Sequence, residues 1–117
     1  MSLTEQMVLR EVRRLTRREL RLWVREGWVR PAMGESGPVF DEIDVARLRL
    51  LCDLRKEMAL SPDAMPVVLA LIDRLHQTRR DLRLLMEVVE DQPDHVRRSV
   101  LDRLRARTGA EAREIGN

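Results

Sequence analysis

Histidine and cysteine, which commonly perform catalysis or hold metal ions, are few in this 117-residue chain, and they stand far apart. His76 and His95 are distant from each other in the sequence, and Cys52 is the only cysteine. Zinc sites place their ligands at short, regular spacings that these residues lack. Gly34 and Gly37 are not followed by the lysine of a phosphate-binding loop. The sequence therefore predicts a protein that is not an enzyme and that takes no metal, cofactor or small-molecule substrate.

Four arginines in one short segment are the first candidates for binding a partner. They are Arg17, Arg18, Arg21 and Arg25. Three of them are spaced by four residues, so a helix places these three on one face. Such a face can contact the phosphates of DNA. It can equally be a solvated face with Glu19 and Glu26 as local partners, and the residues alone leave both interpretations open.

Carboxylates form the second candidate surface. They are Glu35, Asp41, Glu42 and Asp44. Acidic residues at the start of a helix cap its free N–H groups and interact favourably with its dipole, which is one explanation for this cluster. The other is a surface that faces a basic protein partner.

Composition favours a mainly helical protein. Hydrophobic residues make up 44% of the chain, charged residues 36% and aromatic residues only 3%, which leaves little material for a β-sandwich or barrel. The net charge is +2, with basic ends around an acidic middle, and this is not the footprint of a nucleic-acid-binding protein by itself. No apolar run approaches the roughly 20 residues that span a bilayer, and no secretory signal is recognisable. We therefore expect a cytoplasmic protein without membrane contact.

The first sixty residues read as two short helices, a hairpin and a third helix. The periodicity predicts a helix over residues 4–14, and Thr16 with Glu19 fits a capping box that opens a second helix ending at Gly27. Apolar runs at 28–31 and 38–40 flank a glycine-bearing stretch and predict a small hairpin, or wing. A third helix, capped by Asp41, is expected through about residue 58. Its inward-facing residues are predicted to be Ile43, Val45, Ala46, Leu48, Leu51, Cys52 and Leu54.

A long helix is predicted over residues 66–90, after a distorted first turn that Ser61 caps. Its apolar seam has a seven-residue spacing with intervening leucines, which is typical of a short coiled coil and predicts a homodimer. The seam consists of Val68, Leu71, Leu75, Leu82, Leu85 and Val89. A last helix opens at Pro93, and the chain from 108 onward is expected to be a disordered tail. Residues 1–60 and 61–107 thus form a head and a helical extension of a single domain.

Two stretches of the head resemble a known family. Residues 20–31, LRLWVREGWVRP, resemble the second helix and wing entry of MerR-type winged helix-turn-helix regulators, and residues 40–49 resemble their third helix. Residues 37–42, 49–60 and 67–73 are similar to CbpM, the family of small modulators of the DnaJ-like co-chaperone CbpA. These resemblances imply a mainly α fold: a MerR-like winged helix-turn-helix head with a small β wing, then a long dimerisation helix and a C-terminal helix.

Two departures from the MerR pattern separate the implied functions. Leu22 and Trp23 replace a tyrosine pair that helps MerR proteins to contact DNA, and the wing lacks the usual arginine. A wing without its cation loses a phosphate anchor. Similarity to CbpM implies binding to the J-domain of CbpA, with inhibition of its co-chaperone and DNA-binding activity. Specific DNA binding is not expected.

The expected docking surface for the J-domain is the wing exit and the start of the third helix. Its residues are Val39, Phe40, Asp41, Glu42 and Asp44. Phe40, the only phenylalanine, can alternatively fill the core beneath the wing. Two other interpretations stay open. One is a MerR-family transcriptional regulator that uses the four arginines, and the other is a dimeric helical scaffold with another partner.

Overall fold

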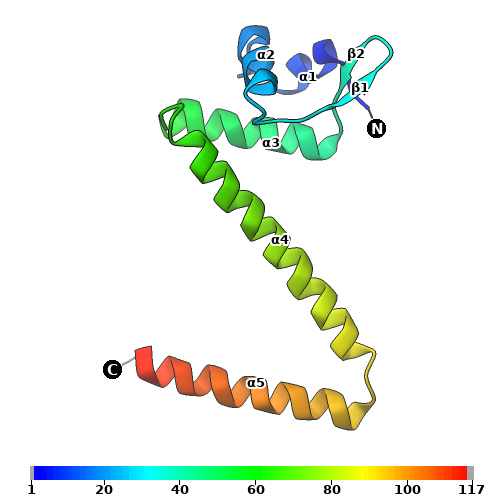
Figure 1. Ribbon diagram of the computed structural model, residues 1–117, viewed down its shortest axis with the longest axis vertical. Coiled ribbons are helices and arrows are strands. Elements are labelled where there is room, and N and C mark those ends of the chain that lie inside the picture. The colour runs from blue at the N-terminus through cyan, green and yellow to red at the C-terminus, as the bar shows by residue number, and fades with distance from the viewer. Residues whose placement is uncertain (1, 116–117) are drawn as a thin grey trace. The chain divides into compact units, whose positions relative to one another are not determined.

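The computed structural model describes the backbone of residues 2–115 and the burial of side chains over 2–110, and it confirms a mainly helical chain with a small β hairpin (Figure 1). The elements in chain order are α1 (Glu5–Glu11), α2 (Arg17–Arg25), β1 (Ala32–Gly34), β2 (Gly37–Val39), α3 (Glu42–Cys52), the π-helix η1 (Asp53–Glu57), α4 (Met65–Glu90) and α5 (Asp94–Ile115). The chain divides into two compact units, Met1–Leu71 and Ile72–Asn117. The first unit contains the whole predicted head, residues 1–60, and the beginning of α4.

Cap chemistry defines both ends of α2. The Thr16 hydroxyl accepts a hydrogen bond from the Glu19 N–H (3.2 Å), and the Glu19 carboxylate accepts one from the Thr16 N–H (3.0 Å). At the other end Gly27 has a φ of +76°, and the Trp28 N–H donates to the Trp23 carbonyl across 2.9 Å. This is a Schellman ending, which needs a left-handed residue and therefore favours glycine. The predicted capping box and the predicted stop at Gly27 are both confirmed.

The hairpin exists, but its first strand is Ala32–Gly34 and not residues 28–31. Trp28 and Val29 are buried, so this stretch, which follows the end of α2, belongs to the core and not to the wing. Only two residues connect the strands, and Ala32 pairs with Val39 in antiparallel register. Phe40 then exchanges two backbone hydrogen bonds with Leu3, at 2.7 and 2.8 Å, which joins the N-terminal segment to the exit of the wing (Figure 1).

A single core fills the first unit. Its fully buried side chains are Val8, Leu20, Trp23, Val29, Phe40, Leu48, Leu51, Cys52 and Met65. The Trp23 and Trp28 rings pack with centroids 6.4 Å apart. Burial raises the pKa of the Cys52 thiol, so it stays protonated and acts as a small apolar residue.

Two residues of α3 that we predicted to face inward do not. Ile43 is 77% exposed, and Ala46 is exposed as well. The core face of α3 is the stripe of Val45, Leu48 and Cys52, at the three- and four-residue spacing of a helix. Ile43 lies two residues before the start of that stripe, which turns it about 200° away from the core.

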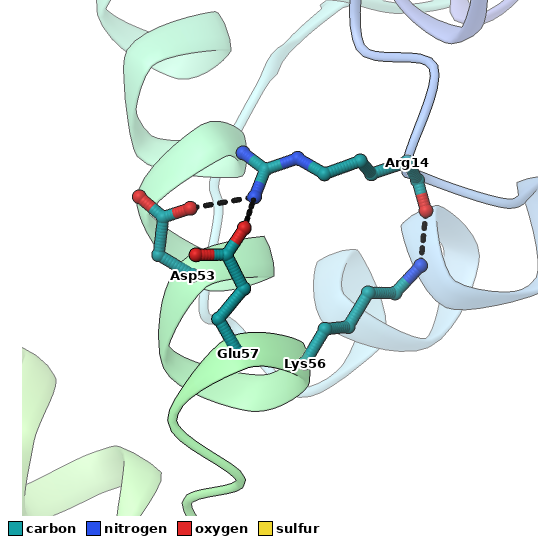
Figure 2. A network of polar contacts seen from close by, with 4 residues as sticks. All are labelled: Arg14, Asp53, Lys56 and Glu57. Carbon is teal, nitrogen blue, oxygen red and sulfur yellow. Dashed lines mark hydrogen bonds and ion pairs between the residues drawn. The ribbon is translucent and has the colours of Figure 1, made fainter.

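Helix α3 ends earlier than residue 58, and a π-helical turn follows it. The Met58 N–H bonds to the Asp53 carbonyl and the Leu60 N–H to the Leu54 carbonyl, both at 2.9 Å. Ala59 has a φ of +54°, the one non-glycine residue with positive φ in the described part of the chain. A network of polar contacts fastens this turn to the loop between α1 and α2, because Arg14 reaches Asp53 (2.6 Å) and Glu57 (2.7 Å) (Figure 2).

The second unit consists of the rest of α4 and of α5. Helix α4 begins at Met65, one residue before the predicted start, and the Ser61 hydroxyl accepts a hydrogen bond from the Ala64 N–H (3.2 Å). Helix α5 continues to Ile115, past residue 108, where we expected a tail to begin. Between residues 72 and 110 no side chain is buried. No helix within residues 2–115 has the length and apolar character needed to cross a membrane.

Candidate functional site

The arginine face of α2 is not free, because a carboxylate from α1 lies against it. The Glu5 Oε1 atom is 3.0 Å from the Arg21 Nε and 3.3 Å from the Arg17 Nε. Glu5 is in the first turn of α1, whose N-cap is Thr4. One carboxylate thus pairs with two of the four arginines that DNA binding would use and neutralises half of their charge.

The two other arginines differ from this pair. Arg18 and Arg25 are exposed and form no ion pair with any residue in the described part of the chain. The local partners that we expected for the arginine face, Glu19 and Glu26, are not the ones found, because Glu19 pairs instead with Lys56 at 2.8 Å. Glu19 was the expected partner because it is near the arginines on the same helix, whereas the observed partner of Arg17 and Arg21 is Glu5 on the preceding helix.

A groove lies beside this arginine face, bounded by the start of α1, by α2 and by the wing. Residues that line it are Thr4, Glu5, Gln6, Arg17, Arg21 and the hairpin residues 34–39. Between residues 32 and 39 the wing has no lysine or arginine, and its one charged residue is Glu35. Met33 on β1 is 77% exposed. The wing therefore presents an apolar and an acidic side chain where a phosphate contact would require a cation.

The predicted acidic surface lies at the N-terminus of α3. Asp41 and Asp44 form a second capping box, in which each carboxylate accepts the backbone N–H of the other residue, at 2.8 and 3.0 Å. Burial raises the pKa of Asp44, and the neighbouring Asp41 charge acts in the same direction, although the backbone hydrogen bond opposes both. Glu42 is exposed and takes no part in the box. The capping interpretation therefore holds for Asp41 and Asp44. The exposed carboxylate of Glu42 does not cap the helix and is accessible to a partner.

The apolar residues of this surface are not the ones we predicted. Phe40 is 1% exposed and belongs to the core, in line with the alternative role as a core residue, and Val39 is half-buried. Ile43, which we placed in the core, is exposed between Glu42 and Asp44. The signal that identifies Ile43 is its position off the apolar stripe of α3. An exposed isoleucine that stands between two acidic residues in the sequence is a combination suited to contact with a protein.

The predicted dimer seam is mostly exposed. Leu71, Leu75, Leu82 and Leu85 are 48–60% exposed, whereas Val68 and Val89 are half-buried. Within the second unit the C-terminal part of α4 and the facing part of α5 line an apolar groove, with Leu82, Leu85, Met86, Val100, Leu101 and Leu104 as its apolar residues. Charged residues also line it: Glu90 and Asp91 follow the α4 leucines, and Arg97, Arg103 and Arg107 are on α5.

No cluster of three or more histidine, cysteine, aspartate or glutamate side chains with the geometry of a metal site occurs among the described residues.

Comparison with protein families identifies the family of the head. Residues 9–70 match the MerR HTH family regulatory protein, and this range covers more than half of the chain. It includes α2, the wing, α3 and the beginning of α4. No curated protein and no solved structure matches the chain. The helix-turn-helix, the hairpin that follows it and the matching range agree, and the chain therefore belongs to the MerR HTH family of regulatory proteins.

Proposed function

We propose that this protein is a non-enzymatic chaperone modulator of the CbpM kind, acting in the cytoplasm. It binds the J-domain of a DnaJ-like co-chaperone of the CbpA type and thereby inhibits that protein's co-chaperone and DNA-binding activity. The observation that carries the proposal is the exposure of Ile43 in the acidic first turn of α3, next to Glu42 and Asp44 in the sequence.

The docking surface consists of Ile43 with Val39, Asp41, Glu42 and Asp44. Protein interfaces typically combine a desolvated apolar centre with a charged rim that steers association. Ile43 supplies the centre, because an isoleucine that is 77% exposed gains most by being covered. Similarity to CbpM implies a J-domain as the partner, and the basic helix of a J-domain has the charge opposite to this rim. The Phe40 side chain takes no direct part in docking because it is buried.

Two features of the head support a function other than DNA binding. Phosphate contacts from lysine and arginine provide most of the affinity of proteins for DNA. Here Glu5 pairs with both Arg17 and Arg21 and neutralises half of their charge, and the wing lacks any basic residue. We therefore expect only non-specific binding to duplex DNA, with a dissociation constant of about 10⁻⁴–10⁻⁶ M at physiological salt.

Transcriptional regulation is the second candidate function, and one observation favours it. Arg18 and Arg25 remain exposed on α2 without an ion-pair partner among the described residues, as a DNA-reading helix requires. A nanomolar footprint of this protein on its own promoter would support that function and contradict the modulator proposal. Without such a footprint, the two arginines are a solvated surface.

We also propose that the second unit associates with a second copy of itself. Its leucines have no core to enter, since no side chain over residues 72–110 is buried, and exposed apolar surface of this kind marks an interaction site. The groove has acidic residues from α4 and arginines from α5. In a twofold dimer that sets the end of α4 in one copy against α5 of the other, these opposite charges face each other, and the symmetry repeats each such contact. Charge complementarity thus favours a second copy over an unrelated partner.

The modulator proposal is tested by titrating the full-length protein with the purified J-domain of a CbpA-like co-chaperone in a calorimeter. We expect saturable binding, and we expect loss of J-domain-stimulated ATP hydrolysis by the Hsp70 partner when the modulator is added. A J-domain whose basic helix has its lysines and arginines replaced by glutamine is the matched control. If the unmodified J-domain does not bind, the proposal is rejected. The interpretation as a dimeric helical scaffold with another partner would then remain.

A further inference from the structure

We propose that Glu5 is an internal competitor of DNA phosphate. Its carboxylate occupies the position on α2 where Arg17 and Arg21 would hold a phosphodiester oxygen, and its neutralisation exposes a phosphate-binding site in the groove beside the wing. The inference concerns nucleic acid alone and does not depend on which protein the α3 surface binds.

The geometry of the three side chains supports this role. Both guanidinium groups reach the same oxygen, Glu5 Oε1, at 3.0 and 3.3 Å. The Glu5 side chain is 25% exposed, whereas those of Arg17 and Arg21 are 57% and 65% exposed. The carboxylate therefore lies beneath two cations that still face the solvent. Two guanidinium groups that converge on one oxyanion form the arrangement that arginines use to bind phosphate.

The backbone holds Glu5 in this position. Leu3 and Phe40 exchange two hydrogen bonds, at 2.7 and 2.8 Å, which fasten the chain next to the exit of the wing. Thr4 then caps α1 by accepting the Met7 N–H at 3.3 Å, and Glu5 is the first residue of that helix. Because this backbone is already fixed, pairing of the Glu5 carboxylate costs side-chain entropy alone. Glu5 thus competes effectively with a phosphate from solution.

The groove provides further partners for an oxyanion once the carboxylate is neutral. The hydroxyl-bearing side chains of Thr4 and Ser36 line it, together with both arginines. Hydroxyl groups and arginines are the usual donors to phosphate oxygens in protein–DNA contacts. With Glu5 charged, the three side chains sum to +1, and with Glu5 neutral they sum to +2. The added charge should appear as additional counterion release on DNA binding.

The test compares Glu5→Gln with the unmodified full-length protein for binding to a labelled 20-base-pair duplex of arbitrary sequence, by fluorescence anisotropy between 50 and 200 mM KCl. We expect the variant to bind about tenfold more tightly at 50 mM, with a salt dependence steeper by about one to two in logarithmic slope. Glu11→Gln is the matched control, because it removes the same charge from the same helix and affects only a 3.6 Å pair with Arg49. Adding Arg17→Gln and Arg21→Gln to the Glu5→Gln variant should abolish the gain.

Three results would overturn the inference: Glu5→Gln that is folded by circular dichroism and binds like the unmodified protein, an equal gain in Glu11→Gln, or a gain that survives removal of both arginines. Arg17→Gln with Arg21→Gln in the otherwise unmodified chain gives a further check. This pair should weaken DNA binding by a smaller factor in the unmodified chain than in the Glu5→Gln variant, because the charged Glu5 carboxylate keeps both arginines from binding phosphate. An equal loss in both backgrounds would contradict the proposal. The Glu5→Gln variant should still bind the J-domain. A failure of the proposal for Glu5 is therefore distinguishable from a failure of the modulator proposal.

Discussion

The Lys56 Nζ atom lies 2.8 Å from the Glu19 Oε1 atom, which joins η1 to the capping box of α2. The same oxygen accepts the Thr16 N–H at 3.0 Å, so one carboxylate caps a helix and forms an ion pair at once. Lys56 also donates to the Arg14 carbonyl, and Arg14 in turn reaches Asp53 and Glu57 (Figure 2). Through these contacts the turn between α1 and α2 is fixed to the end of α3, which orients α2.

Glu19 should make the stability of the head depend on pH. Burial raises the pKa of Glu19, but hydrogen bonds from Lys56 and Thr16 outweigh it, so the pKa lies below its ordinary value. A carboxyl group whose pKa is lower in the folded state stabilises the protein fully above its unfolded-state pKa, about 4.3. This contribution is lost as the pH falls through the folded-state pKa.

Glu19→Gln isolates the charge, because glutamine can still accept the Thr16 N–H in a capping box. We expect the variant to lower the free energy of unfolding by about 0.5–1 kcal/mol at pH 7, and we expect this difference to shrink as the pH falls below the unfolded-state pKa. Urea denaturation at several pH values measures this. Glu26→Gln, at the exposed end of the same helix, should change stability little at any of these pH values, and a constant difference for Glu19→Gln would contradict the linkage.

Replacing Ala59 with glycine should stabilise the folded protein. Its φ of +54° is left-handed, which costs an L-residue about 1–2 kcal/mol, whereas glycine adopts it without a Cβ clash. Since glycine loses about 0.5–1 kcal/mol of additional entropy on folding, we expect Ala59→Gly to raise the free energy of unfolding by about 0.5–1 kcal/mol. Ala70→Gly, in the interior of α4, should instead lower it by a similar amount. Urea denaturation of both variants decides the matter, and two changes of the same sign would contradict the strain at Ala59.

Features that depend on a few neighbouring residues were predictable from sequence, and those that depend on tertiary packing were not. The capping box of Thr16 with Glu19 and the stop at Gly27 are local, so their residue types suffice to identify them. The first strand of the wing was misplaced because burial of Trp28 is decided by what packs against it. The partner of Arg17 was missed for the same reason, since Glu5 approaches only after α1 and α2 have packed.

The docking surface on α3 should respond to charge and apolar changes in different ways. Glu42→Lys should slow association with the J-domain and flatten its salt dependence, because charges at the rim of an interface act mainly on the on-rate. Glu42 is chosen over Asp44, whose substitution would also break the capping box. Ile43→Ala should mainly speed dissociation, since it removes the apolar centre.

Surface plasmon resonance with the immobilised J-domain measures both rates. Asp63→Lys is the matched control, because it makes the same kind of charge reversal at an exposed site beyond the opposite end of α3, and it should bind as the unmodified protein does. If Glu42→Lys and Ile43→Ala fold and bind like the unmodified protein, the J-domain docks elsewhere.

Leucines of the second unit should control assembly. Leu82 is 55% exposed and lines the groove between α4 and α5, so an aspartate there would place an unpaired charge in the centre of the proposed interface. We expect the unmodified protein to sediment at micromolar concentration as a species of twice 13.7 kDa, and Leu82→Asp to sediment as the monomer.

Leu84→Asp is the matched control, because Leu84 is 61% exposed, lies about 200° around the same helix and does not line the groove. Leu84→Asp should remain dimeric, and urea denaturation should show that neither substitution alters the stability of the head, whose core ends at Leu69. A monomeric unmodified protein, or a Leu82→Asp variant that still dimerises, would contradict the proposed interface.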